Sequence, residues 1–96
     1  MTSKDIIELF KNGETSAISG TKSNPGNVKI SGDKLIHYRT PILERYENGY
    51  IFNMSRYSVQ TGRLQNHIKE LIPEDLLVTV TRVPSEYKDS LADFLE

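Results

Sequence analysis

Few residues in this chain could carry out catalysis or hold a metal ion. The two histidines are His37 and His67, cysteine is absent, and the carboxylate at helical spacing from His67 is Glu70. A zinc site needs three or four ligands, so this pair is insufficient. The serines lack a Gly-x-Ser-x-Gly elbow, and the glycines lack the spacing of a phosphate-binding loop. We therefore expect no enzyme activity, no catalytic residues, no metal site and no cofactor.

Polar and basic side chains that could bind a macromolecule gather between residues 56 and 69. Such groups suit contacts with phosphates and base edges, although the same composition describes any solvated helix face. The acidic pI of about 6.1 argues against a dedicated DNA-binding protein, so a protein partner is the stronger expectation. The candidate binding residues are Arg56, Tyr57, Gln60, Arg63, Asn66, His67 and Lys69.

A helix must present these side chains, and the apolar spacing predicts one over residues 59–72. Its apolar positions i, i+4, i+7 and i+8 are Leu64, Ile68, Leu71 and Ile72. Ser58 is the candidate N-cap, and Pro73 ends the run. Gly62 is an unusual residue here, since glycine costs about 1 kcal/mol relative to alanine inside a helix. It either admits a close approach to the backbone or is tolerated near the helix end.

A β-hairpin is predicted just before this helix. Asn48-Gly49 suits the positive φ angles of a type I′ turn and separates the extended segments 42–46 and 50–54. A two-residue turn there places Leu43 opposite Met54, whereas a longer loop changes the register. One face then carries Leu43, Arg45, Glu47, Tyr50, Phe52 and Met54, and the other carries Ile42, Glu44, Tyr46, Ile51 and Asn53.

The remaining strands complete a small sheet around the hairpin. Short runs rich in β-branched residues and bounded by turn residues predict strands at 17–19, 28–30, 34–38 and 76–83. The last run follows the long helix and can return to the sheet beside an earlier strand. If the part from Leu76 to Thr81 lies at a sheet edge, it can also pair with its own copy, which leaves a homodimer open.

Two short helices are predicted at the ends of the chain. Thr2 or Ser3 can cap the first, whose apolar stripe includes Phe10. Pro84-Ser85 introduces the second, with Tyr87, Leu91 and Phe94 or Leu95 on one side. The expected fold class is α+β: a small antiparallel sheet of about four or five strands with a central β-hairpin, packed by a long helix and short terminal helices.

Length and charge narrow the class of function. The 96 residues predict a single domain, 1–96, with one modest core and a binding surface rather than a deep cleft. The formal net charge is −1, but residues 20–69 hold eight Lys/Arg against three acids. Residues 70–96 hold seven acids against two basic residues. With no cysteine and nothing resembling a signal peptide or a membrane span, we expect a soluble, intracellular protein.

One set of residues carries a resemblance to a protein family. The set comprises Gly32-Asp33-Lys34-Leu35, Tyr38-Arg39-Thr40-Pro41-Ile42, Asn53, Tyr57-Ser58, Thr61, Gln65 and Ile68. A leucine–tyrosine strand leading into threonine-proline-isoleucine, and a later tyrosine-serine opening a helix with threonine and glutamine, resembles small bacteriophage-encoded proteins of unknown function. The resemblance covers about residues 15–69 and includes fewer threonines at the helix start than the family pattern. It implies a phage or prophage origin and brings no catalytic residues.

Two functions are expected on these grounds. The first is a non-enzymatic inhibitor of a bacterial defence nuclease, anti-CRISPR-like, that acts by protein–protein contact on a host protein or ribonucleoprotein complex. The alternative is a DNA-binding accessory or regulatory protein that uses the basic segment 20–69, with nucleic acid as its partner. In either case we expect the protein to act in the cytoplasm of the host cell and not at a membrane.

Overall fold

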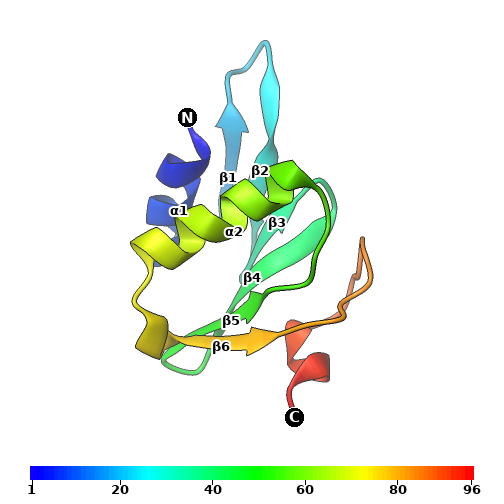
Figure 1. The fold of residues 1–96 in the computed structure, drawn as a ribbon. Helices are drawn as coiled ribbons and strands as arrows, with labels where there is room; N and C mark the ends of the chain where they lie inside the picture. The colour runs from blue at the N-terminus through cyan, green and yellow to red at the C-terminus, as the bar shows by residue number, and fades with distance from the viewer.

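The computed structural model describes residues 1–96 and shows an α+β fold in which two helices cover one face of a six-stranded sheet (Figure 1). The helices are α1 (Ser3–Lys11) and α2 (Val59–Leu71), with short 3₁₀ helices η1 (Glu74–Leu76) and η2 (Leu91–Phe94). The strands are β1 (Ser16–Gly20), β2 (Pro25–Ser31), β3 (Lys34–His37), β4 (Thr40–Tyr46), β5 (Gly49–Asn53) and β6 (Leu77–Val80).

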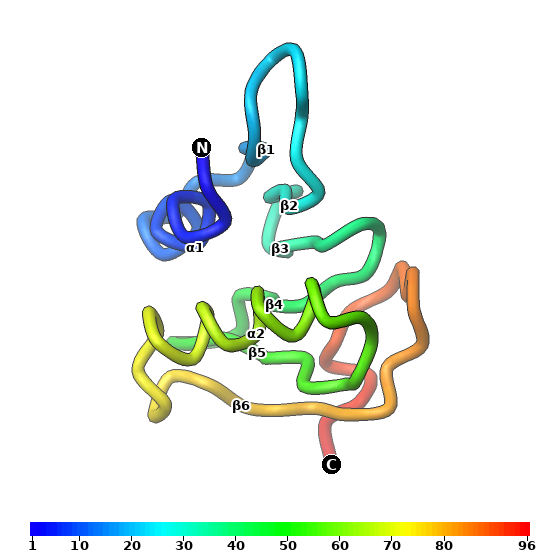
Figure 2. The backbone as a smooth tube through the Cα atoms, turned by 45° about the horizontal axis from the view of Figure 1, so that its top comes forward, coloured from blue at the N-terminus to red at the C-terminus, as the bar shows by residue number.

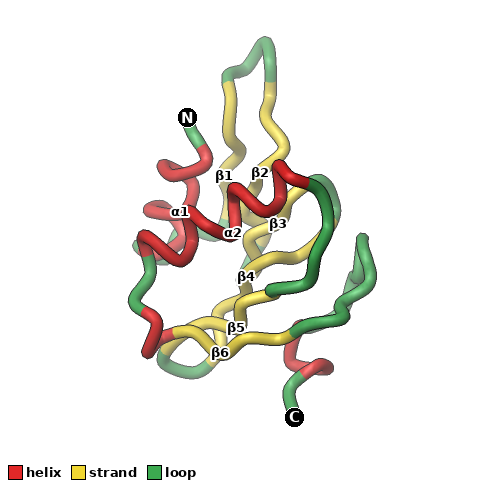
Figure 3. Tube along the Cα trace, viewed as in Figure 1, coloured by secondary structure: helices red, strands yellow, loops and turns green.

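The strands follow one another across the sheet in chain order, β1 to β6. The first five form an antiparallel meander, and β6 pairs with β5 in parallel. The prediction of about four or five antiparallel strands is therefore wrong in number and in the last pairing. The reason is the crossover: α2 carries the chain back along the sheet, so β6 runs in the same direction as β5 (Figure 3).

The predicted hairpin is present as β4 and β5, but in a different register. Leu43 pairs with Phe52 and Tyr46 pairs with Gly49, so the two turn residues are Glu47-Asn48. Glu47 takes the left-handed conformation, with φ of 52°. The predicted turn at Asn48-Gly49, with Leu43 opposite Met54, is wrong. Because the register differs by an even number of residues, the alternation of faces is preserved.

Gly49 has a role other than the one predicted for it. A Cβ atom at Gly49 would lie 2.3 Å from the carbonyl oxygen of Leu76, in the turn that leads into β6. The glycine is therefore required by the close approach of two backbones, rather than by a positive φ angle.

Ile42 departs from the predicted alternation because of a β-bulge. Leu35 pairs with Leu43 and Ile36 pairs with Pro41, which leaves Ile42 as the extra residue of β4. Ile42 and Leu43 are consequently both fully buried in the same core cluster. The prediction that Ile42 lies on the opposite face from Leu43 is wrong for this reason.

The main core lies between the helices and the sheet. The N-cap of α1 is Thr2, one of the two residues predicted for it. The Thr2 N–H donates to the Asp5 carboxylate, and the Thr2 hydroxyl oxygen accepts from the Asp5 N–H. These hydrogen bonds lower the pKa of Asp5. The buried residues of this core are Ile6, Ile7, Phe10, Val28, Ile30, Leu35, Ile42, Leu43, Phe52, Leu64, Ile68 and Ile72. Both predicted amphipathic faces, of α1 and of α2, are therefore in place.

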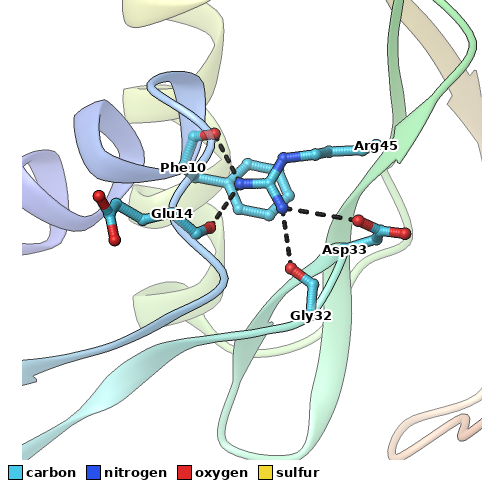
Figure 4. Close-up of polar contacts among 5 residues, drawn as sticks. All are labelled: Phe10, Glu14, Gly32, Asp33 and Arg45. Atoms are coloured by element: carbon cyan, nitrogen blue, oxygen red, sulfur yellow. Dashed lines mark hydrogen bonds and ion pairs between the residues drawn. The ribbon is translucent and has the colours of Figure 1, made fainter.

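Arg45 fastens α1 to the sheet (Figure 4). Its guanidinium carbon lies 4.0 Å from the centre of the Phe10 ring, and its nitrogens donate to the carbonyl oxygens of Phe10 and Gly32 at 2.8 Å. It also donates to the Glu14 carbonyl and lies 3.7 Å from the Asp33 carboxylate. This one side chain joins β4 to the end of α1 and to the β2–β3 turn.

The opposite face of β4–β6 is covered by the C-terminal segment. Ile51, Val80, Val83 and Leu91 form a second buried cluster there. The predicted C-terminal helix is wrong: residues 84–90 are irregular, and only η2 is helical (Figure 2). Side chains of the sheet bind the backbone amides of this segment, since Glu44 accepts from Leu91 N–H at 2.8 Å.

We predict opposite effects for alanine at two glycines. Gly49→Ala is expected to lower the free energy of unfolding by about 1–3 kcal/mol, because its Cβ collides with a backbone oxygen. Gly62→Ala is the matched control. No atom outside the helix lies within 4 Å of a Cβ at this position, so alanine should raise the free energy of unfolding by about 0.5–1 kcal/mol. Urea unfolding followed by circular dichroism measures both, and effects of the same sign would contradict the close approach at Gly49.

Candidate binding site

A mostly polar hollow of about 420 Å³ lies between the start of α1, residues 60–67 of α2 and one end of β1–β3. α2 contributes Gln60, Arg63 and His67, and the end of β3 contributes His37 and Tyr38. The remaining walls come from the start of α1, the end of β1 and the start of β2. Three of the seven predicted binding residues therefore converge on one concave surface.

The helical repeat places Gln60, Arg63 and His67 side by side. They stand at i, i+3 and i+7 of α2, which is one side of a helix. Ser58 is the N-cap, as predicted, and its hydroxyl oxygen accepts from the Thr61 backbone N–H at 3.2 Å. The neighbouring side of α2 packs on the sheet through Leu64 and Ile68, so the hollow forms beside the core contact.

His37 forms the inner wall of the hollow. It is buried, with 6% of its surface exposed, and its Nδ1 lies 2.8 Å from the Thr61 hydroxyl oxygen. Burial lowers the pKa of His37 below its usual value, because the desolvated imidazolium loses its hydration. The neutral imidazole is therefore the stable form in the folded protein near neutral pH.

Tyr38 stands at the rim. Half of its surface is exposed, its ring centre lies 4.4 Å from that of His37, and its φ angle is 59°. A tyrosine in the left-handed region carries backbone strain of about 1 kcal/mol or more, which the neighbouring contacts must offset. The left-handed backbone and the contact with the His37 ring, which is tilted by 50° to that of Tyr38, hold an aromatic surface at the mouth of the hollow.

His67 lies on the α2 side with one third of its side chain exposed. Its Nδ1 atom is buried and makes no hydrogen bond, because the nearest carboxylate oxygen, Oε2 of Glu70, is 3.9 Å away. Glu70 in turn lies 3.5 Å from the Lys4 amino group on α1. The predicted i, i+3 neighbours His67 and Glu70 thus lie near each other on α2, but their side chains are too far apart for a hydrogen bond.

The other four predicted residues lie outside the hollow. The Tyr57 hydroxyl donates to the Val83 carbonyl at 2.5 Å and accepts from the Asn53 amide at 3.0 Å. Arg56 is exposed near the end of β6, Asn66 is exposed on the outer side of α2, and Lys69 borders a separate hollow beside β6. The seven candidates therefore do not form a single site.

A buried hydrogen-bond network that the sequence analysis did not predict joins β4, β5 and α2. The Asn53 side chain donates to the Pro41 carbonyl at 2.9 Å and accepts from the Ser55 N–H at 2.9 Å. Gln65 Nε2 donates to the carbonyls of Asn53 and Ser55 at 2.8 and 2.9 Å. Among the residues that carry the phage-protein resemblance, Asn53, Thr61 and Gln65 are buried and Tyr57 is partly buried against them. The available signal was a glutamine between Leu64 and Ile68, within the apolar side of a helix.

No three aspartate, glutamate or histidine side chains meet in an arrangement that could hold a metal ion. Neither helix combines the length and the apolar character needed to span a bilayer. No protein-family model, curated protein or solved structure matches the chain. The resemblance to small phage proteins accordingly stays a prediction.

The network predicts a large difference between two asparagines. Asn53→Ala leaves the Pro41 carbonyl and the Ser55 N–H unpaired in the interior, so it should lower the free energy of unfolding by about 2–4 kcal/mol. Asn66→Ala, the matched control on the exposed side of α2, should change it by less than about 0.5 kcal/mol. Equal losses in chemical denaturation would show that the amide network contributes little.

The lowered pKa of His37 predicts a pH-dependent stability. Protonation is easier in the unfolded chain, so stability is complete above the unfolded pKa of about 6.5 and is lost as the pH falls through the folded pKa. The slope can reach at most about 1.4 kcal/mol per pH unit for one proton. Unfolding measured from about pH 7.5 to about pH 5.5, roughly one unit on either side of the reference value, tests this. His37→Gln should remove the His37 slope and His67→Gln should retain it; an unchanged slope in His37→Gln would refute the assignment.

Proposed function

We propose that this protein is a non-enzymatic binding protein that inhibits a bacterial defence nuclease by covering one of its functional surfaces. The observation that supports a recognition role is the convergence of Gln60, Arg63 and His67 with His37 and Tyr38 on one hollow. The choice of a defence nuclease as the target rests on the resemblance to phage proteins. The binding partner is accordingly a host protein or ribonucleoprotein complex.

The chemistry of the hollow favours an acidic side chain of the partner. Arg63 is exposed and makes no ion pair within its own chain, so its guanidinium is free to bind a carboxylate through two parallel hydrogen bonds. Tyr38 adds an exposed aromatic ring at the same rim. Arginine and tyrosine are among the residue types that most often dominate the energy of a protein–protein interface.

The alternative, a DNA-binding accessory protein, has less support from the placement of the basic residues. Of the basic residues in 20–69, the half-buried Arg45 donates to carbonyl groups of its own chain, and Lys34 Nζ donates to the carbonyls of residues 88 and 89. Arg39 pairs with Glu86 at 3.5 Å. One observation supports the DNA-binding alternative. Lys29, Arg39 and Lys88 line a hollow of about 480 Å³ near the open side of β2 and β3.

Charge reversal at two positions of α2 tests the proposal. Arg63→Glu should weaken binding and inhibition of the target nuclease by about 10- to 100-fold, because a carboxylate would then face a carboxylate. Lys69→Glu makes the same change in charge outside the hollow and should stay within about threefold of the parent protein. Affinity is measured by titration and inhibition by a cleavage assay with a panel of defence nucleases.

Two results would contradict the proposal. One is that the protein binds none of the nucleases in the panel. The other is that Arg63→Glu and Lys69→Glu lose affinity for the target to the same extent. DNA titrations at increasing salt separate the alternative, because phosphate contacts weaken steeply with ionic strength. DNA binding with that salt dependence, abolished by Lys29→Glu and retained in Arg63→Glu, would favour the DNA-binding alternative.

A further inference from the structure

Two arginines outside the hollow beside α2 line a second hollow together. Arg56 lies between β5 and α2, Arg82 lies just after β6, and both are exposed. The hollow that they border has a volume of about 480 Å³ and shares no lining residue with the hollow beside α2. Its other walls are formed by Met54, Ser55, Thr81, Val83 and Pro84.

A buried hydrogen bond brings the two arginines to the same place. The Ser55 hydroxyl oxygen accepts from the Val83 N–H at 2.8 Å, and both residues are buried. Arg56 directly follows Ser55, and Arg82 directly precedes Val83. The bond therefore joins the two chain segments that carry the arginines (Figure 2). Both side chains start from fixed points on one rim.

The backbone of Arg82 is strained. Its φ angle is 62°, in the left-handed region that glycine adopts freely and that residues with a Cβ rarely adopt. The chain turns there so that Val83 can enter the second buried cluster, where it is 3% exposed. Glycine would make the same turn without strain, so the arginine side chain brings no benefit to the turn. Strained residues of this kind cluster at functional sites.

The positive charge of this hollow is not neutralised within the chain. Neither arginine forms an ion pair, and no aspartate or glutamate lines the hollow. The basic hollow beside β2 and β3 differs in this respect, because Glu86 lies there and pairs with Arg39 at 3.5 Å. Like charges on one rim repel each other, and a bound anion offsets that repulsion.

We propose that this hollow binds a small phosphomonoester, with the phosphate held between Arg56 and Arg82. A phosphomonoester carries about 1.5 to 2 negative charges near neutral pH, which matches two guanidinium groups. Each guanidinium can bind two phosphate oxygens through parallel hydrogen bonds, and the Thr81 hydroxyl lines the same hollow as a further donor. A nucleic-acid backbone carries one charge per phosphate and therefore matches the pair less well.

The remaining lining favours an organic group on the phosphate. The volume of about 480 Å³ lies in the range of small-molecule sites. Met54, Val83 and Pro84 form an apolar wall beside the arginines. A ring or another apolar group of the ligand can lie against this wall and lose its contact with water.

NMR titration of the full chain tests the proposal, with phenyl phosphate and adenosine 5′-monophosphate as probes. We expect at least one of these probes to shift the amide signals of Arg56, Thr81 and Arg82. Phenol and adenosine, which lack the phosphate, should leave these signals unchanged. Inorganic phosphate should bind about tenfold more weakly than the better probe, because it makes no contact with the apolar wall.

Three variants separate ligand contact from structure. Arg56→Gln and Arg82→Gly should each weaken binding by about tenfold or more, because each removes one charged fork from the phosphate. Arg82→Gly should also unfold at the same urea concentration as the parent protein or at a higher one, since glycine relieves the strain. Lys22→Gln removes the same charge from the exposed β1–β2 turn and should stay within about twofold of the parent.

Four results would overturn the proposal. They are the absence of shifts with both probes, inorganic phosphate binding as tightly as the better probe, equal losses in Lys22→Gln and Arg56→Gln, and oligonucleotide binding that does not depend on a terminal phosphate. Because Arg63 and the hollow beside α2 take no part in these measurements, the test is independent of the proposed function.

Discussion

The arrangement of this molecule depends on how the chain leaves β5 and enters α2. Backbone groups in that buried turn cannot reach water, so they must be paired within the protein. The carboxamides of Asn53 and Gln65 do this by binding the backbone of Pro41, Ser55 and Asn53 itself. β4, the turn and α2 are thereby fixed to one another. Ser55 extends the connection, because its hydroxyl accepts from the Val83 N–H at 2.8 Å and anchors the chain after β6.

The same network determines the form of the hollow. Thr61 lies one helical turn before Gln65 on α2 and contacts the His37 ring on β3. The carboxamides thus set the rotation of α2, and Thr61 sets its distance from β3. With the helix fixed in this way, Arg63 and His67 face the hollow rather than solvent at large. The proposed binding surface and the stability of the fold therefore depend on neighbouring residues of one helix.

Local signals were sufficient for much of the fold and insufficient for the rest. The caps at Thr2 and Ser58, the period of α2 and the paired segments of the hairpin follow from nearest neighbours in sequence. The register of the hairpin does not follow from them, because Gly49 is required by the close approach of the Leu76 backbone, which is far away in sequence. The amphipathic C-terminal segment is likewise held by Glu44 instead of by its own carbonyls. For the hollow, the period of α2 groups Gln60, Arg63 and His67, whereas the contribution of His37 and Tyr38 requires the sheet order.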